Sequence, residues 1–271
     1  MATLKVDKEV CNGCGICVQT CPQGLIELKS GNYPEMSGEG ICIACGHCVA
    51  SCPSEALDND RASIIYQLPL NAFPVLDPLT AENFLRSRRS VRNYKSDSIS
   101  RDTLLKLLNI SRYAPSGHNS QGLSYIVIEN TQMLRKISSI TINWLESLLN
   151  ANVQWVNNFK SVINDYRNVG VDTILRGAPC LIVATAPKWL GMAQDSAKFS
   201  LEYIELYATS LGLGTCWAGF VQLCAQADYK PMLELMKLDE SVAVVGSLMA
   251  GYPKYNFKRL VERNPLNVSW I

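Results

Sequence analysis

The sequence has no excess of charge of either sign and no hydrophobic run of membrane-spanning length. Its 271 residues carry 25 Lys and Arg against 24 Asp and Glu, a formal net charge of +1. No overall field therefore attracts nucleic acid or an anionic membrane, and we expect neither as a partner. The N-terminus has no apolar stretch typical of a signal peptide. The apolar run 242–251 has about half the length of a membrane-spanning helix. We therefore expect a cytoplasmic protein.

Cysteine, in contrast, is abundant and unevenly distributed. Of eleven cysteines, eight lie between residues 11 and 52, and the other three are scattered over the rest of the chain. Structural disulfides are not expected in a reducing compartment, so the concentrated thiols indicate a metal-binding module. We predict a small domain over residues 1–60, a linker over 61–77 that contains prolines, and a larger domain over 78–271.

The eight cysteines form an internal repeat. Residues 11–22 and 42–53 both follow C-x2-C-x2-C-x3-C-P, with a shift of 31 positions. In such runs the first three thiolates hold one iron–sulfur cubane and the fourth completes the other. The repeat therefore predicts two 4Fe–4S clusters, with the ligand sets Cys11, Cys14, Cys17, Cys52 and Cys42, Cys45, Cys48, Cys21.

Structural zinc is the alternative for these cysteines, because paired C-x2-C motifs also form zinc sites. A zinc site, however, would leave the third cysteine and the trailing Cys-Pro of each copy without a role, so we favour the clusters. Residues 1–60 resemble the bacterial two-cluster ferredoxins. That resemblance implies a small ferredoxin-like domain.

The rest of the chain mixes helical and strand patterns, which predicts an α+β fold. Expected helices span 101–113, with Ser100 as the N-cap, 195–211 and 231–237, and helical material is expected over 131–168. Expected strands span 123–129, 179–186, 215–219 and 242–250. The 195–211 helix is apolar around most of its circumference, so it should be buried centrally or in a subunit interface. In the linker, Ile64, Ile65, Leu68 and Phe73 are expected to dock on the protein surface.

Three separate segments have the chemistry of a cofactor site. The segment 86–92, RSRRSVR, offers four guanidinium groups that can grip a phosphate, although a basic helix end alone is more often a solvated face. The segment 114–121, APSGHNSQ, offers amides suited to a ring edge. The segment 212–219, GLGTCWAG, has glycines that allow close backbone approach but lacks the G-x-G-x-x-G dinucleotide pattern.

Together, these segments resemble the FMN-dependent nitroreductase family over residues 78–271. The resemblance implies an α/β/α domain with a central sheet, and a homodimer with FMN at the subunit interface. It implies that Arg88, Arg89, Ser90 and Arg92 contact the phosphate and ribityl chain, with Arg263 as a further phosphate contact. It also implies that Pro115, Ser116, Asn119 and Gln121 line the flavin ring on one side, and Gly214, Thr215 and Cys216 on the other. His118 and Cys216 are the candidates for contact with substrate, and no catalytic side chain is assigned.

The predicted activity is an oxidoreductase in which the clusters relay single electrons to FMN. The acceptor would be an electron-poor small molecule such as a nitroaromatic, quinone or enone. The donor would be ferredoxin, another reductase or NAD(P)H. An electron carrier or redox sensor, with FMN as a relay and no dedicated substrate, is the alternative.

Overall fold

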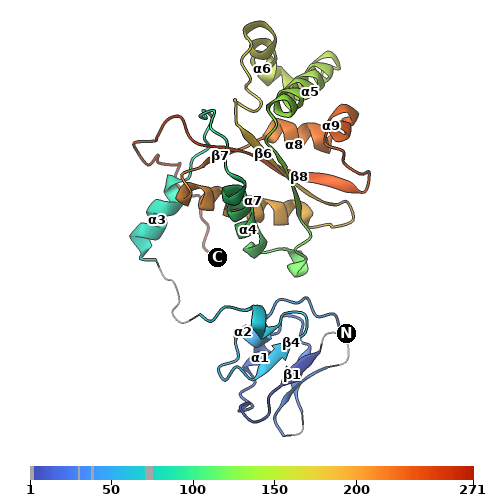
Figure 1. Cartoon of the computed structure of the whole chain (residues 1–271), viewed down its shortest axis with the longest axis vertical. Coiled ribbons are helices and arrows are strands. Elements are labelled where there is room, and N and C mark those ends of the chain that lie inside the picture. Colours follow the sequence, from blue (N-terminus) through green and yellow to red (C-terminus); the bar gives the residue numbers. More distant parts are fainter. Residues whose placement is uncertain (1–2, 30, 38–39, 71–75) are drawn as a thin grey trace. The chain divides into compact units, whose positions relative to one another are not determined.

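The computed structural model describes residues 3–29, 31–37, 40–70 and 76–271. The chain forms two compact units, of which the first comprises Met1–Val75 with His118–Ser120 and the second Leu76–Gly117 with Gln121–Ile271 (Figure 1). Within the described residues, no helix combines the length and the apolar character needed to cross a membrane.

The first unit is built from two short antiparallel sheets and two helices. Strand β1 (Leu4–Val6) pairs with β4 (Leu57–Asn59), and β2 (Ile26–Leu28) pairs with β3 (Pro34–Met36). Helices α1 (Ile16–Thr20) and α2 (His47–Ala50) occupy equivalent positions of the 31-residue repeat. They are followed by a 3-10 turn, η1 (Ile64–Tyr66).

The two halves of this unit are related as the repeat predicts. Each helix begins after a glycine in the left-handed region, Gly15 at φ 72° and Gly46 at φ 73°. The hydroxyls of Thr20 and Ser51, which are 31 residues apart, are hydrogen-bonded to each other at 3.1 Å. A bond between equivalent residues places them beside the pseudo-twofold axis.

The linker docks less than predicted. Ile64 packs against the small core that includes Ile26, Val49 and Leu57. Ile65 and Leu68, however, are exposed. The prediction was therefore wrong for these two side chains. Phe73 lies outside the described residues.

The second unit has a four-stranded antiparallel sheet in the order β5-β6-β8-β7. Its strands are β5 (Ser124–Ile128), β6 (Cys180–Pro187), β7 (Gly214–Trp217) and β8 (Val242–Gly251). The longer helices are α3 (Pro78–Ser87), α4 (Arg101–Asn109), α5 (Thr131–Asn150), α7 (Ala193–Ser210), α8 (Gly219–Gln226) and α9 (Lys230–Leu235). Between them lie α6 (Lys160–Asn164) and the shorter turns η2 (Ile110–Tyr113), η3 (Gly117–Asn119), η4 (Gln154–Phe159) and η5 (Asp165–Val169).

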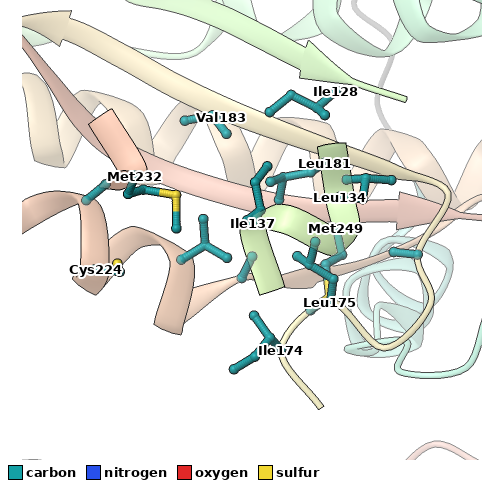
Figure 2. Packing of buried hydrophobic residues seen from close by; sticks show 14 of the residues in the cluster. Ile128, Leu134, Ile137, Ile174, Leu175, Leu181, Val183, Cys224, Met232 and Met249 are labelled. Atoms are coloured by element: carbon teal, nitrogen blue, oxygen red, sulfur yellow. The ribbon is translucent and has the colours of Figure 1, made fainter. Parts of the chain in front are cut away.

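Helices cover both faces of this sheet, which confirms the α/β/α architecture (Figure 1). Because side chains alternate along a strand, Leu181 and Val183 of β6 pack with α5, α8 and α9, whereas Cys180 and Ile182 pack with α4 and α7. Figure 2 shows Leu181 beside Ile137 of α5 in the first of these cores.

The helical material predicted over 131–168 is present in several pieces, and one helix was not predicted. The segment 131–168 is one long helix, α5, followed by a 3-10 turn, the short α6 and a π turn, η5. The chain leaves α5 after Asn150, and Asn152 has a left-handed φ of 57°. The helix that was not predicted is α8, which follows β7 directly.

Candidate functional site

Two cavities in the first unit are each lined by four cysteines. Cys11, Cys14, Cys17 and Cys52 line the first cavity. Cys21, Cys42, Cys45 and Cys48 line the second. In each cavity the fourth cysteine comes from the other copy of the repeat, which is the interleaving that the spacing predicts. The role of these thiols as cluster ligands stays a prediction that this arrangement supports.

Backbone amides surround these thiols. The N–H of Ala56 donates to Cys52 Sγ at 3.3 Å, and the equivalent N–H of Leu25 donates to Cys21 Sγ at 3.4 Å. The N–H of Ala44 also donates to Cys42 Sγ at 3.4 Å. Hydrogen bonds of this kind stabilise negative charge on sulfur, so they suit ligands of an anionic cluster.

Burial raises the pKa of the Cys17 and Cys48 thiols, and the other thiols of the same set add to this effect. Cys52 acts on Cys17 and Cys21 acts on Cys48, which are contacts across the repeat. A bound metal reverses this preference by holding the sulfur as thiolate. In the described part of the chain, no three His, Cys, Asp or Glu side chains converge closely enough to hold one metal ion. Four thiols distributed around one cavity match instead the donor set of a cubane cluster.

In the second unit, the arginine segment lies along the edge strand β7. Ser90 forms a parallel bridge with Thr215, and the N–H of Val91 donates to the Thr215 carbonyl at 2.8 Å. Gly214 permits this approach, because a Cβ at this position would lie 2.5 Å from Val91 Cγ2. These contacts place the arginine segment beside the GLGTCWAG turn.

Arg88 and Arg89 line an open groove together with Gly214, Thr215 and Phe257. The groove encloses about 620 Å³ of empty space including its mouth. Arg88 and Arg89 also line the adjoining cavity that contains Arg263. Three of the four predicted phosphate-binding arginines are thus brought together from distant parts of the chain.

A buried carboxylate stands behind these arginines. Glu205 Oε1 lies 3.6 Å from Arg88 Nη1 and accepts a hydrogen bond of 3.0 Å from the Thr215 hydroxyl. Burial raises the pKa of Glu205, and Arg88 acts in the opposite direction. Sequence reasoning missed Glu205, because a single acid inside an apolar helix carries no motif.

Cys216 is a buried residue of β7. Burial raises the pKa of its thiol, whereas the nearby charges of Arg92 and Arg176 lower it. The structure thus brings Arg92, the fourth predicted phosphate contact, close to Cys216. Arg176 was also missed, since it lies outside the three cofactor segments.

The segment 114–121 lines a different cavity. Ser116 and Gln121 face it together with Arg112, Tyr125 and Ser200. The N–H of Gln121 donates to Ser116 Oγ at 3.1 Å. Of the residues that the structure describes, none lines both this cavity and the arginine groove. One chain therefore presents the two predicted halves of a flavin site separately.

The loop that joins these residues has unusual backbone geometry. His118, Asn119 and Gln121 all adopt left-handed φ values, of 51°, 50° and 47°. Such conformations are uncommon outside glycine and concentrate at functional sites. Pro115 and His118 are exposed, and His118–Ser120 is grouped with the first unit.

Comparison with known proteins identifies both parts of the chain. A model of the nitroreductase family matches residues 85–252, and a model of a 4Fe-4S dicluster domain matches residues 10–57. A relative from Archaeoglobus fulgidus, provisionally named NADH dehydrogenase/NAD(P)H nitroreductase, is 26% identical over 172 residues, which is 62% of this chain and 82% of the relative.

Solved structures agree on the fold. A nitroreductase with bound FMN from Desulfitobacterium hafniense has a TM-score of 0.57 at 22% identity and covers 70% of this chain and 97% of its own. A second, from Bacteroides fragilis, also with bound FMN, has a TM-score of 0.55 at 21% identity and covers 73% of this chain and 98% of its own.

Proposed function

Because the chain belongs to the nitroreductase family and carries a 4Fe-4S dicluster domain, we propose that it is an FMN-dependent oxidoreductase fed by two 4Fe–4S clusters. The clusters would relay single electrons to FMN, which would reduce an electron-poor acceptor such as a nitroaromatic, quinone or enone. The single observation that carries this proposal is the separation of eight cysteines into two interleaved sets, each around its own cavity.

The arginine groove fits the phosphate end of FMN. Arg88, Arg89 and Arg263 offer several donors to a phosphate, and bidentate hydrogen bonds from guanidinium to phosphate are among the strongest available. The bound FMN of the two related structures supports the same assignment. FMN supplies the two-electron chemistry when it is bound, and the protein binds it, orients it and excludes water.

We also propose that the working form is a homodimer. The groove that holds Arg88 and Arg89 also contains Gly214 and Thr215, which are predicted for one side of the ring. Ser116 and Gln121, which are predicted for the other side, line a different cavity of the same chain. A second copy that supplies its Ser116 and Gln121 to the arginine groove of the first would complete both sites at once.

Anaerobic purification followed by quantification of iron, sulfide and flavin tests the proposal. We expect about eight irons, eight sulfides and one FMN per chain. Reduced with dithionite, the protein should turn over a nitroaromatic. Rapid electron exchange with partner proteins, with no small molecule reduced, would favour an electron carrier instead. Two zinc ions and no sulfide would overturn the cluster assignment.

Substitution of one predicted ligand should separate the two kinds of cofactor. In Cys14→Ser we expect iron to fall by about half, because one of two four-iron clusters loses a ligand, while FMN stays bound. Iron content and flavin absorbance of the same sample measure this. Cys224→Ser, at a buried cysteine outside both cavities, is the matched control and should keep all eight irons. Loss of FMN along with the iron in Cys14→Ser would contradict the division of cofactors between the two units.

A further inference from the structure

The repeat offers an internal comparison between the two cluster sites. Residues 31 positions apart hold equivalent places, so any difference between them distinguishes one site from the other. Leu28 ends β2 and lines the first cavity. Its counterpart, Asn59, ends β4 and lines the second. An apolar side chain at one site thus corresponds to a primary amide at the other.

The environment of Asn59 fixes what this amide can do. Asn59 is only 2% exposed. Its Oδ1 accepts a hydrogen bond of 3.0 Å from the N–H of Arg61. The acceptor end of the amide is thereby engaged, and the Nδ2 group carries the two donor hydrogens of a side chain that lines the second cavity. Leu28 offers no donor, and it is 39% exposed.

A positive charge reinforces this difference. Arg61 Nη1 donates to the carbonyl oxygen of Cys42, a predicted ligand of the second cluster, at 2.5 Å. The counterpart of Arg61, Ser30, lies outside the described residues. Donors and positive charge near a cluster stabilise the extra electron of its reduced form, and so raise its reduction potential.

Two features act in the opposite direction. The hydroxyl of Ser54 lies 3.7 Å from Cys52 Sγ in the first set, and Cys14 of that set is exposed. The Ser54 contact is long for a hydrogen bond, even one to sulfur. Exposure stabilises the more highly charged reduced form through water rather than through a fixed donor. The amide of Asn59 is buried at the second site, and the exposed guanidinium of Arg61 is held by its bond to the Cys42 carbonyl, so we weigh these two groups more heavily.

We propose that Asn59 sets the two clusters at different potentials, with the cluster of Cys42, Cys45, Cys48 and Cys21 the higher. This rests on the proposed presence of two clusters. On reduction by a low-potential one-electron donor, each cluster gains one electron, and no bond forms or breaks. The first electron to enter would reside on the cluster of the second site. Asn59 is thus a residue that tunes the electron relay without being a ligand.

Reciprocal exchange of the two residues in the full chain tests this, with anaerobic redox titration against dithionite followed by electron paramagnetic resonance. The wild type should show two distinct midpoints. Asn59→Leu should shift the higher midpoint downward and leave the lower unchanged. Leu28→Asn should shift the lower midpoint upward and leave the higher unchanged. Cys14→Ser, which removes the first cluster, assigns the midpoints.

The outcomes separate the inference from the function on which it rests. Fewer than two clusters per wild-type chain would overturn the proposed function. Two clusters whose midpoints are unaffected by Asn59→Leu would overturn only the inference. If Asn59→Leu fails to fold, Leu28→Asn at its partly exposed position still decides, because no upward shift there would equally reject the role of the amide.

Discussion

At the residue scale, Arg88 is expected to have two roles that substitutions can separate. It pairs with the buried Glu205 and it faces the predicted phosphate groove. In Arg88→Met, we expect FMN affinity to fall about 10–100-fold, as for loss of one charge-assisted hydrogen bond. The free energy of unfolding should also fall by roughly 2 kcal/mol. This is less than the loss expected for a fully buried ion pair, because the Arg88 side chain is 23% exposed.

The double variant Arg88→Met with Glu205→Gln separates the roles. It removes the unpaired carboxylate, so the midpoint of chemical unfolding should recover while FMN affinity stays low. Fluorescence quenching of FMN on addition of apoprotein measures affinity, and intrinsic fluorescence measures unfolding. Recovery of both quantities would mean that Arg88 does not contact FMN. Recovery of neither would mean that its pairing with Glu205 does not stabilise the fold.

The same pair predicts a pH dependence. Burial raises the pKa of Glu205 above its ordinary value, so the folded state favours the protonated carboxyl. The contribution of Glu205 to stability is therefore fully present below about pH 4.3, the ordinary value, and is lost as pH rises through the raised pKa. Without Arg88 this pKa rises further. The destabilisation of Arg88→Met relative to wild type should therefore grow with rising pH in unfolding titrations, and a constant difference would contradict it.

At the element scale, the arginine segment depends on its attachment to β7. In Gly214→Ala the new methyl would lie 2.5 Å from Val91 Cγ2 and 3.0 Å from Pro253 Cγ. Such overpacking costs about 1–3 kcal/mol, and moving Val91 would also displace Ser90 from its bridge to Thr215. We expect both stability and FMN affinity to fall. Gly219→Ala is the matched control, because its methyl would meet Trp217 at an ordinary 3.7 Å. Equal effects of the two variants would refute this attachment.

The elements that could be predicted from sequence are those with strong local signals. Strand β8 was predicted from its unbroken apolar run, and the start of α4 from Ser100, whose Oγ accepts the N–H of Thr103 at 3.2 Å. Helix α8 was missed because its eight residues, GFVQLCAQ, follow a strand directly and are too short to establish a period. The prediction did not place the end of α5 at Asn150, because Asn152, which takes a left-handed φ of 57° there, stands inside a longer stretch with helical pattern.

Some residues of the candidate site could likewise be predicted from the sequence, and others could not. Arg88, Arg89, Ser90 and Arg92 stand in one run, so sequence alone could group them. Both sets of cysteines follow from a repeat of known geometry. Glu205 reaches the site through its contacts with Arg88 and Thr215, and Arg176 through its charge near Cys216, and no local pattern distinguishes them. A residue that reaches a site only through the folded structure cannot be identified from a single sequence.

At the scale of the whole molecule, the second unit exposes several large apolar side chains. On α7, Phe199 is 52% exposed and Tyr203 is 39% exposed. They lie one turn apart on the same face of the helix. The C-terminal segment adds exposed Leu266 and Trp270. Exposed apolar side chains gather at subunit interfaces, so this face of α7 is a candidate for the proposed subunit interface. From the sequence, this helix was expected to be buried either centrally or in a subunit interface. In the structure, one face of the helix is buried and another is exposed.

Charge introduced on this face of α7 should therefore break the dimer and the flavin site together. In Phe199→Asp with Tyr203→Asp, we expect the chain to elute as a monomer, because two carboxylates would have to be desolvated in the interface. FMN affinity should fall steeply, since neither arginine groove would be completed by a second copy. Iron content should stay unchanged, as the eight predicted ligand cysteines lie in the first unit. Val169→Asp, at an exposed position on the turn η5, provides the control for added surface charge and should remain dimeric. Light scattering and flavin titration of the same samples measure both effects, and a monomer that binds FMN as tightly as the wild type would show that one chain suffices for the site.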